Sequence, residues 1–166
     1  CKPCSITTGF AGAGAFSDGK LSLSPDVGGN LPEILGYDRT IELLKESDDI
    51  YLKFGADEKV YGIDEAEEIA SIRKKAIQAN LKLIECPIRH LGTEEGYKIY
   101  SRLQEHLLNE GVDMIFDTMV KDIIIEDGVA KGVVTDKGET YTADEIVAAV
   151  GREGSEWLSG ICRKYD

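Results

Sequence analysis

A pair of strand-like runs on either side of Asp127-Gly128 constrains the fold more than any other feature of the chain. Residues 119–126 and 129–135 are rich in Ile and Val. An Asp-Gly linker between two such runs is the strongest short-range signal for a β-hairpin, because both residues tolerate positive φ. A second turn at Lys137-Gly138 leads to a third short run at residues 140–142. The sequence therefore predicts a three-stranded antiparallel meander.

An almost wholly apolar segment follows the meander. Residues 145–150 (EIVAAV) have the composition of a buried central strand, and Gly151 and Arg152 come directly after them. Ligands of open α/β sheets bind beyond the carboxyl ends of the strands. The planar guanidinium of Arg152 suits bidentate binding of a phosphate or a flavin carbonyl. We therefore consider Gly151 and Arg152 as ligand-binding residues, with a solvated arginine after a glycine turn as the alternative.

A glycine-rich stretch lies near the start of the chain, at residues 8–21 (TGFAGAGAFSDGKL). Closely spaced glycines let backbone N–H groups approach a phosphate or a planar cofactor, but they are equally typical of a mobile linker. Within the stretch, Asp18 is suited to a tight turn and Lys20 to the neutralisation of a phosphate or a reduced flavin. The residues alone leave both interpretations open.

Helix-like and strand-like patterns alternate between these features. The predicted helices are 37–47, 65–80 and a segment from Thr93 to the residue before Gly111, and the predicted strands are 49–54, 81–86 and 112–116. This order predicts an α/β (α+β) fold with helices layered on a sheet. Predicted boundaries near Ser24 and Leu91 divide the chain into a glycine-rich segment (1–24), a small α/β domain (25–91) and a remainder (92–166).

His90 follows the predicted strand 81–86 and is the ionisable group that we single out in the middle of the chain. Histidine changes charge near neutral pH, so His90 is suited to proton transfer, and neighbouring Arg89 is suited to binding an anionic substrate. The alternative for a lone histidine is a structural or surface role. His106 falls among the polar positions of its predicted helix, and we interpret it as solvated.

The composition excludes several classes of partner. Among 166 residues, 42% are hydrophobic and 30% are charged, as in a soluble globular protein, and the formal net charge is −12. An acidic chain without a basic stripe is a poor match for nucleic acid or an anionic membrane surface. No signal peptide or membrane-spanning run is visible, so we expect a cytoplasmic protein. The chain begins at Cys1 without Met, and we expect it to be a piece of a longer polypeptide.

Four cysteines are present, of which Cys1 and Cys4 form a C-x-x-C pair while Cys86 and Cys162 stand alone. A zinc ribbon requires a second pair, and a thioredoxin-like motif requires a preceding strand, so we predict no metal site and ordinary reduced thiols. The alternative is one half of a metal or redox site that upstream residues complete.

Four segments together resemble the bacterial FAD-dependent dehydrogenases of the glutathione-reductase type. They are residues 8–21, 87–93 (PIRHLGT), 119–140 (MVKDIIIEDGVAKGVVTDKGET) and 143–158 (ADEIVAAVGREGSEWL). The resemblance implies a partial FAD-binding domain with the meander, joined to a small substrate-side domain. It also implies an upstream βαβ unit for the FAD pyrophosphate, since Ser17 stands where the G-x-G-x-x-G loop needs its third glycine.

The same resemblance implies a reaction and its residues. Hydride would pass between a small-molecule substrate and FAD, NAD(P) being a second possible cofactor, with His90 and Arg89 catalytic. The implied cofactor-binding residues are Gly12, Gly14, Ser17, Asp18, Gly19, Lys20, Val120, Gly151 and Arg152. Val120 would contact the adenine through its backbone. The alternative function is a non-catalytic module that binds a metabolite or protein and has a glycine-rich linker.

Overall fold

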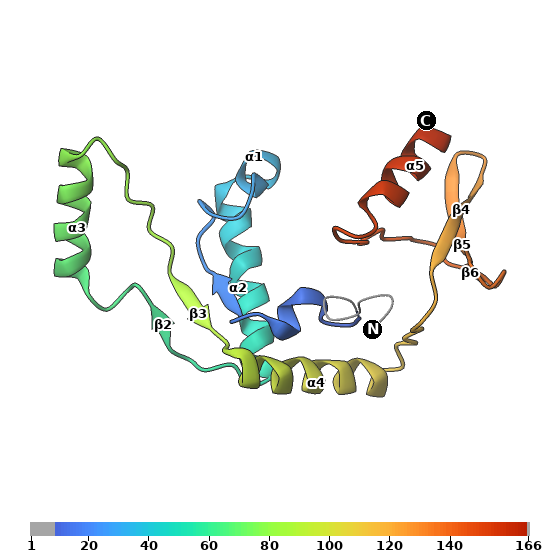
Figure 1. The fold of residues 1–166 in the computed structure, drawn as a ribbon, viewed down its shortest axis with the longest axis horizontal. Coiled ribbons are helices and arrows are strands. Elements are labelled where there is room, and N and C mark those ends of the chain that lie inside the picture. Colours follow the sequence, from blue (N-terminus) through green and yellow to red (C-terminus); the bar gives the residue numbers. More distant parts are fainter. Residues whose placement is uncertain (1–8, 166) are drawn as a thin grey trace. The chain divides into compact units, whose positions relative to one another are not determined.

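The computed structural model describes residues 9–165 and has a mixed α/β fold, as predicted (Figure 1). The chain forms two compact units, and the boundary between them lies between Asp113 and Met114. The domain boundaries predicted from the sequence stay predictions. None of the helices within residues 9–165 is long and apolar enough to cross a membrane.

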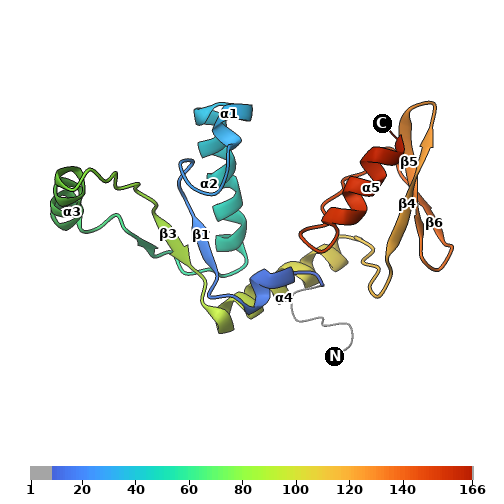
Figure 2. The same cartoon turned by 45° about the horizontal axis from the view of Figure 1, so that its top comes forward.

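The first unit contains short strands and longer helices. Its elements are the 3₁₀ helix η1 (Gly12–Phe16), β1 (Lys20–Ser22), α1 (Leu31–Leu35), α2 (Tyr37–Lys53), β2 (Val60–Tyr61), α3 (Ala66–Gln78), β3 (Ile88–His90) and α4 (Thr93–Asn109). The strands form an antiparallel sheet in the order β1-β3-β2, and Figure 2 shows β1 and β3 side by side. Leu91 and Ile99 are its buried hydrophobic side chains.

The predicted helices are confirmed, with one extension. Helices α3 and α4 match the predictions to within a few residues, and α4 ends before Gly111 as expected. The predicted strand 49–54 is wrong, because α2 continues through it to Lys53. Its alternating Ile50 and Leu52 do not pair with any strand, and the Phe54 N–H donates to the Ile50 carbonyl in the helical pattern.

Three other predicted strands are not formed in the described structure. Residues 81–86, 112–116 and 145–150 carry no strand pairing, and Val147 is 88% exposed although a buried central strand was expected. A strand requires a neighbour that supplies backbone hydrogen bonds, and an apolar run without one gains nothing from being extended. The sheet of the first unit is built instead from short segments that the sequence analysis did not identify, β1 and β2.

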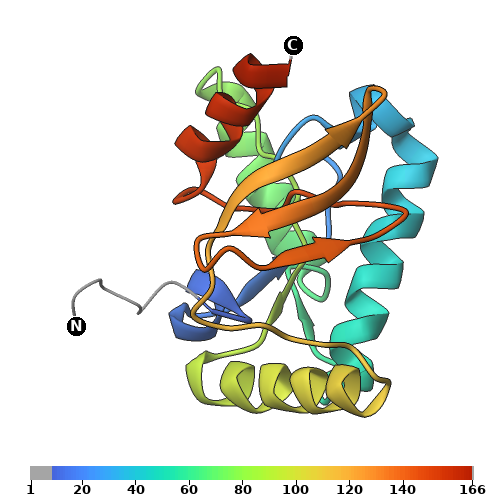
Figure 3. The same ribbon diagram turned by 90° about the vertical axis from the view of Figure 1, so that its right-hand side faces the viewer.

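The second unit is built on the predicted meander, which is confirmed. Strands β4 (Val120–Glu126), β5 (Val129–Thr135) and β6 (Thr140–Thr142) form an antiparallel sheet in that order (Figure 3). Asp127 and Gly128 both have positive φ, 51° and 77°, as a type I′ hairpin turn requires.

A terminal helix, α5 (Ser155–Tyr165), is attached to strand β4. The Trp157 indole N–H donates to the Lys121 carbonyl at 3.0 Å, and the Tyr165 hydroxyl donates to the Ile123 carbonyl at 2.9 Å. Lys164 forms an ion pair with Asp122 on the same strand. Trp157 and Tyr165 therefore attach the helix to β4 through hydrogen bonds.

Candidate functional site

The pairing of β1 with β3 brings the glycine-rich stretch next to the RHLGT segment. Lys20 lies opposite His90 in the register. Just beyond the paired strands, the Leu91 N–H donates to the Gly19 carbonyl at 2.7 Å, and the Gly92 N–H donates to the Asp18 carbonyl at 3.1 Å. Two motifs that are 72 positions apart in sequence therefore form one local structure.

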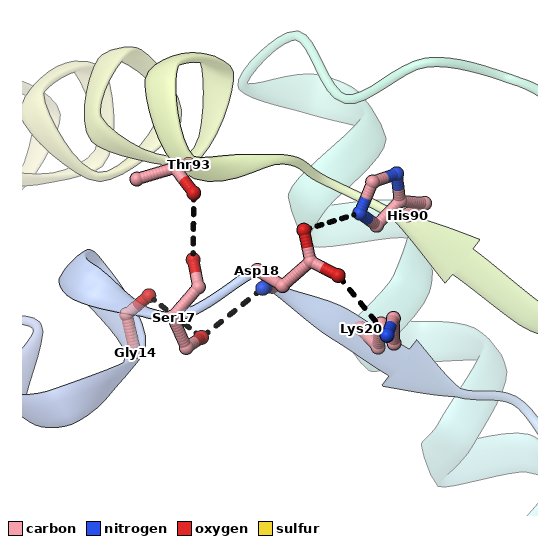
Figure 4. A network of polar contacts seen from close by, with 7 residues as sticks. Gly14, Ser17, Asp18, Lys20, His90 and Thr93 are labelled. Carbon is pink, nitrogen blue, oxygen red and sulfur yellow. Dashed lines mark hydrogen bonds and ion pairs between the residues drawn. The ribbon is translucent and has the colours of Figure 1, made fainter.

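An exposed carboxylate lies at the centre of this structure (Figure 4). Asp18 accepts from His90 Nε2 at 2.9 Å through Oδ1, and its Oδ2 is 3.0 Å from Lys20 Nζ. The hydrogen bond from His90, and then that from Lys20, hold the pKa of Asp18 below its ordinary value of 3.8. Asp18 is therefore an anion at neutral pH. The imidazole of His90 is 38% exposed and reachable from solvent.

The turn before Asp18 is fixed by Ser17. Its hydroxyl donates to the Gly14 carbonyl at 3.2 Å and accepts from the Gly19 N–H at 3.1 Å, and its carbonyl is 3.5 Å from Thr93 Oγ1 at the start of α4 (Figure 4). This part of the stretch is folded against α4 and β3, an arrangement unlike that of a flexible linker.

Two of the predicted glycines are places of close approach. A Cβ at Gly14 would lie 3.0 Å from the Tyr100 hydroxyl, and a Cβ at Gly19 would lie 3.0 Å from the Leu91 Cβ. Gly19 also has a φ of 61°, which L side chains rarely adopt. Gly12 begins η1 in the same stretch. The glycines thus let the stretch dock closely on its neighbours.

Tyr100 supports the stretch from α4. Its hydroxyl is 3.3 Å from that of Tyr51 on α2, and the two rings meet edge to face with centroids 6.0 Å apart. Burial, and then the hydrogen bond with Tyr51, raise the pKa of Tyr100 to about 12. Tyr100 falls within the helix predicted from Thr93, and no local signal in the sequence pointed to its approach to Gly14.

Arg89 points into the first unit and is 4% exposed. Its Nε and Nη2 donate to the two carboxylate oxygens of Asp48 at 2.5 and 2.7 Å, and its Nη1 donates to the Asp57 carbonyl at 2.5 Å. The hydrogen bonds with Asp48 raise the pKa of Arg89 above its ordinary value. To bind a substrate, the guanidinium would have to leave Asp48, and the predicted catalytic role of Arg89 stays a prediction.

Three predicted cofactor residues belong to the second unit. Val120 is the first residue of β4, the strand at one edge of its sheet. It lies opposite Thr135 of β5. Gly151 and Arg152 lie in the turn that precedes α5, where the Arg152 carbonyl accepts from the Ser155 N–H at 3.3 Å. They follow an extended segment rather than a strand. Their roles, too, stay predictions.

No metal site is apparent within residues 9–165, where no three His, Cys, Asp or Glu side chains are grouped to hold an ion. Cys1 and Cys4, on which the alternative of a metal or redox site depends, lie outside the described residues. Of the other two cysteines, Cys86 is half-buried and Cys162 is exposed.

Several polar groups gather on one exposed edge of the first unit. An ammonium, a hydroxyl and an imidazole, from Lys20, Ser17 and His90, lie on one exposed edge beside a loop whose glycines permit close approach. The Lys20 ammonium offers a cationic donor to the carbonyl and nitrogen acceptors of an isoalloxazine ring, whereas the Ser17 hydroxyl and His90 Nε2 already donate to Gly14 and Asp18. The exposed charge of Lys20 is the group of this set that fits the anionic part of a flavin on chemical grounds.

Comparison with known families gives one match. The family model for pyridine nucleotide-disulphide oxidoreductase matches residues 60–161, which include His90, the meander and Arg152. No curated protein matches the chain. The match covers more than half of the 166 residues, so the chain belongs to the pyridine nucleotide-disulphide oxidoreductase family, whose members are flavoprotein oxidoreductases.

Proposed function

We propose that this chain contributes to an FAD-dependent oxidoreductase that moves hydride between a small-molecule substrate and flavin. The observation that carries the proposal is the pairing of β1 with β3, which gathers Asp18, Lys20 and His90 on one exposed edge. The family match adds the class of cofactor. When bound, FAD supplies a two-electron donor or acceptor of hydride.

The protein's part is to orient the reactants and to manage charge and protons. His90 exchanges a proton with the substrate, because its imidazole is accessible and its ring nitrogens can accept and donate a proton. Lys20 places a positive charge where a reduced flavin or a phosphate would be anionic. Gly12, Gly14, Ser17, Asp18 and Gly19 shape the surrounding loop.

The remaining predicted residues have supporting roles in this proposal. Arg89 acts as a positioning residue for its neighbour His90, since its own donors are directed to Asp48 and Asp57. Val120, Gly151 and Arg152, which belong to the second unit, keep their predicted cofactor-binding roles as expectations of the family resemblance. NAD(P) as an additional hydride carrier is an expectation that the family match supports in general terms.

Flavin binding by the complete gene product tests the proposal. We expect a yellow protein, with FAD fluorescence quenched on binding. Lys20→Gln should weaken FAD binding by roughly five- to tenfold, the usual worth of a partly exposed charge contact. Lys98→Gln is the matched control, because Lys98 is similarly exposed (54% against 56%) and also pairs with a carboxylate.

Two results would contradict the proposal. A colourless protein that does not quench FAD fluorescence at high protein concentration would show that the protein does not bind FAD. Equal effects of the two lysine substitutions would mean that the charge near Asp18 has no particular relation to the flavin, and the site would then have to lie elsewhere in the chain.

A further inference from the structure

We propose that Asp18 is the positioning residue of His90 and that it assigns proton transfer to one imidazole nitrogen, Nδ1. This inference rests on the proposed function, in which His90 exchanges a proton with a substrate. It adds the reactive atom and the residue that selects it, and it gives Asp18 a role different from the flavin contact or the tight turn that the sequence indicated.

The first step is the direction of the hydrogen bond between the two residues. Asp18 Oδ1 and His90 Nε2 are 2.9 Å apart. An ionised carboxylate can only accept, and the hydrogen bonds from His90 and Lys20 keep the pKa of Asp18 low. Nε2 must therefore carry the proton and donate it. Neutral His90 is thus the Nε2–H tautomer, with a lone pair on Nδ1.

The second step is that Asp18 cannot easily turn away. The Asp18 carbonyl accepts from the Gly92 N–H, and the neighbouring Gly19 carbonyl accepts from the Leu91 N–H, so the backbone is tied to the two residues that follow His90. The other carboxylate oxygen is held by Lys20. Backbone and side-chain contacts of Asp18 therefore both favour the orientation in which its carboxylate faces the imidazole.

The third step concerns the second ring nitrogen. Figure 4 shows it on the side of the ring away from Asp18. Among the described residues none is hydrogen-bonded to Nδ1, and the nearest aromatic group, Tyr61, meets the imidazole edge to face with centroids 6.5 Å apart. The charged groups around the ring are Asp18, Lys20 and, over Tyr61, Lys59. Nδ1 is the nitrogen that is open to a substrate.

The consequence is a defined path for the proton. When a substrate is oxidised, its hydride would pass to the flavin of the proposed function, and the proton that leaves its hydroxyl or amine goes to Nδ1. Nε2 keeps its own proton, which stays hydrogen-bonded to Asp18. The imidazolium that results is stabilised by the carboxylate, and reduction of a substrate returns the proton from Nδ1. A carboxylate that orients an imidazole in this way is a recurring arrangement in acid–base catalysis.

The regiochemistry of histidine alkylation tests the assignment without any flavin. Bromoacetate reacts with the unprotonated nitrogen, so His90 of the full chain should give mainly the Nδ1-carboxymethyl product. His106, which has no close carboxylate contact nearer than 3.9 Å, is the internal reference and should react mainly at Nε2. We expect the ratio of Nδ1 to Nε2 product to be at least about tenfold higher at His90, the effect of a charge-assisted hydrogen bond.

Variants of Asp18 complete the test. Asp18→Ala should move the product of His90 to Nε2, and Asp18→Asn, which keeps the shape, should lower the Nδ1 fraction even if the alanine variant folds poorly. Alkylation of wild-type His90 at Nε2, or an Nδ1 product that survives both substitutions, would overturn the proposal. If His90 resists the reagent, ¹⁵N spectra of the labelled chain give the tautomer directly, and protonated Nδ1 in neutral His90 would be equally decisive.

Because these measurements use the protein without flavin, their outcome is separate from that of the proposed function. A chain that fails to bind FAD but alkylates at Nδ1 retains the Asp18–His90 arrangement and loses its assigned reaction. A chain that binds FAD but alkylates at Nε2 keeps the cofactor and loses the role of Asp18.

Discussion

Asp48 on α2 and Arg89 on β3 are joined by two parallel hydrogen bonds, from Nε and Nη2 to the two carboxylate oxygens. The side chains are 12% and 4% exposed. This pair anchors the strand residue immediately before His90, and the third guanidinium contact, to the Asp57 carbonyl, ties in the segment before β2. The orientation of His90 thus depends on the Asp48–Arg89 ion pair, which itself contacts neither the proposed substrate nor the flavin.

Asp48→Ala should lower the free energy of unfolding by about 3 kcal/mol, because it leaves a buried guanidinium without its counter-charge. Urea unfolding followed by circular dichroism measures the change. Asp49→Ala is the matched control, since Asp49 is the exposed neighbour on the same helix, and we expect a change within about 0.5 kcal/mol. Equal effects of the two substitutions would show that the Asp48–Arg89 pair does not hold the strand.

The pKa of Asp18 should rise towards 3.8 in His90→Gln, because the hydrogen bond from His90 is the largest cause of its depression. Lys20→Gln should raise it by less. The folded state binds this proton more weakly than the unfolded state does, so the contribution of Asp18 to stability is present above the unfolded pKa and is lost as pH falls through the folded one. Titration of the Asp18 carboxyl ¹³C signal measures the shift, and an unchanged midpoint in His90→Gln would contradict the contact.

Much of the fold follows from local sequence signals. The Asp127-Gly128 pair predicts its hairpin because two consecutive residues that tolerate positive φ are what a two-residue hairpin turn requires. The spacing of apolar residues alone predicts α4. The strand predicted at 49–54 fails for a physical reason: Ile50, Leu52 and Phe54 alternate, but helix α2 is already propagating, and extending it by a turn costs less than a strand without a neighbour.

The candidate site was predictable in its parts and not in its assembly. His90 and the glycine-rich stretch are each visible in the sequence, yet their pairing depends on three-residue strands with no distinctive pattern. Asp48 lies in a Ser-Asp-Asp run that reads as a helix end, and only the folded chain shows that Arg89 reaches it across 41 positions. Contacts of this kind carry no local signal, because tertiary packing alone selects the partner.

Tyr100 provides a prediction at alkaline pH. Its pKa is raised to about 12, first by burial and then by the hydrogen bond with Tyr51, so the folded state holds this proton more tightly than the unfolded state does. The stabilisation is present below the unfolded pKa of about 10 and is lost as pH rises through the folded one. Between about pH 10 and pH 12, the free energy of unfolding of Tyr100→Phe should therefore fall less than that of the wild type.

The difference in absorbance at 295 nm between each protein and its Tyr100→Phe counterpart isolates the ionisation of Tyr100 from that of the other tyrosines. Tyr51→Phe removes the hydrogen bond and should lower the midpoint of Tyr100, whereas Tyr97→Phe, on the same helix and 67% exposed, should leave it in place. A Tyr100 midpoint that is the same in all three proteins would mean that the two hydroxyl groups do not interact in solution.

Gly128 and Gly160 give opposite expectations for the same substitution in the second unit. Gly128 has a φ of 77° in the hairpin turn, and Gly128→Ala should cost about 1 kcal/mol, because Cβ crowds the carbonyl in the left-handed region. Gly160 lies within α5 with open space around it, and Gly160→Ala should add roughly 0.5–1 kcal/mol by reducing the freedom of the unfolded chain. Thermal unfolding measures both. A loss of stability in Gly160→Ala would mean that α5 is not helical there, and a neutral Gly128→Ala would mean that the meander turns by another route.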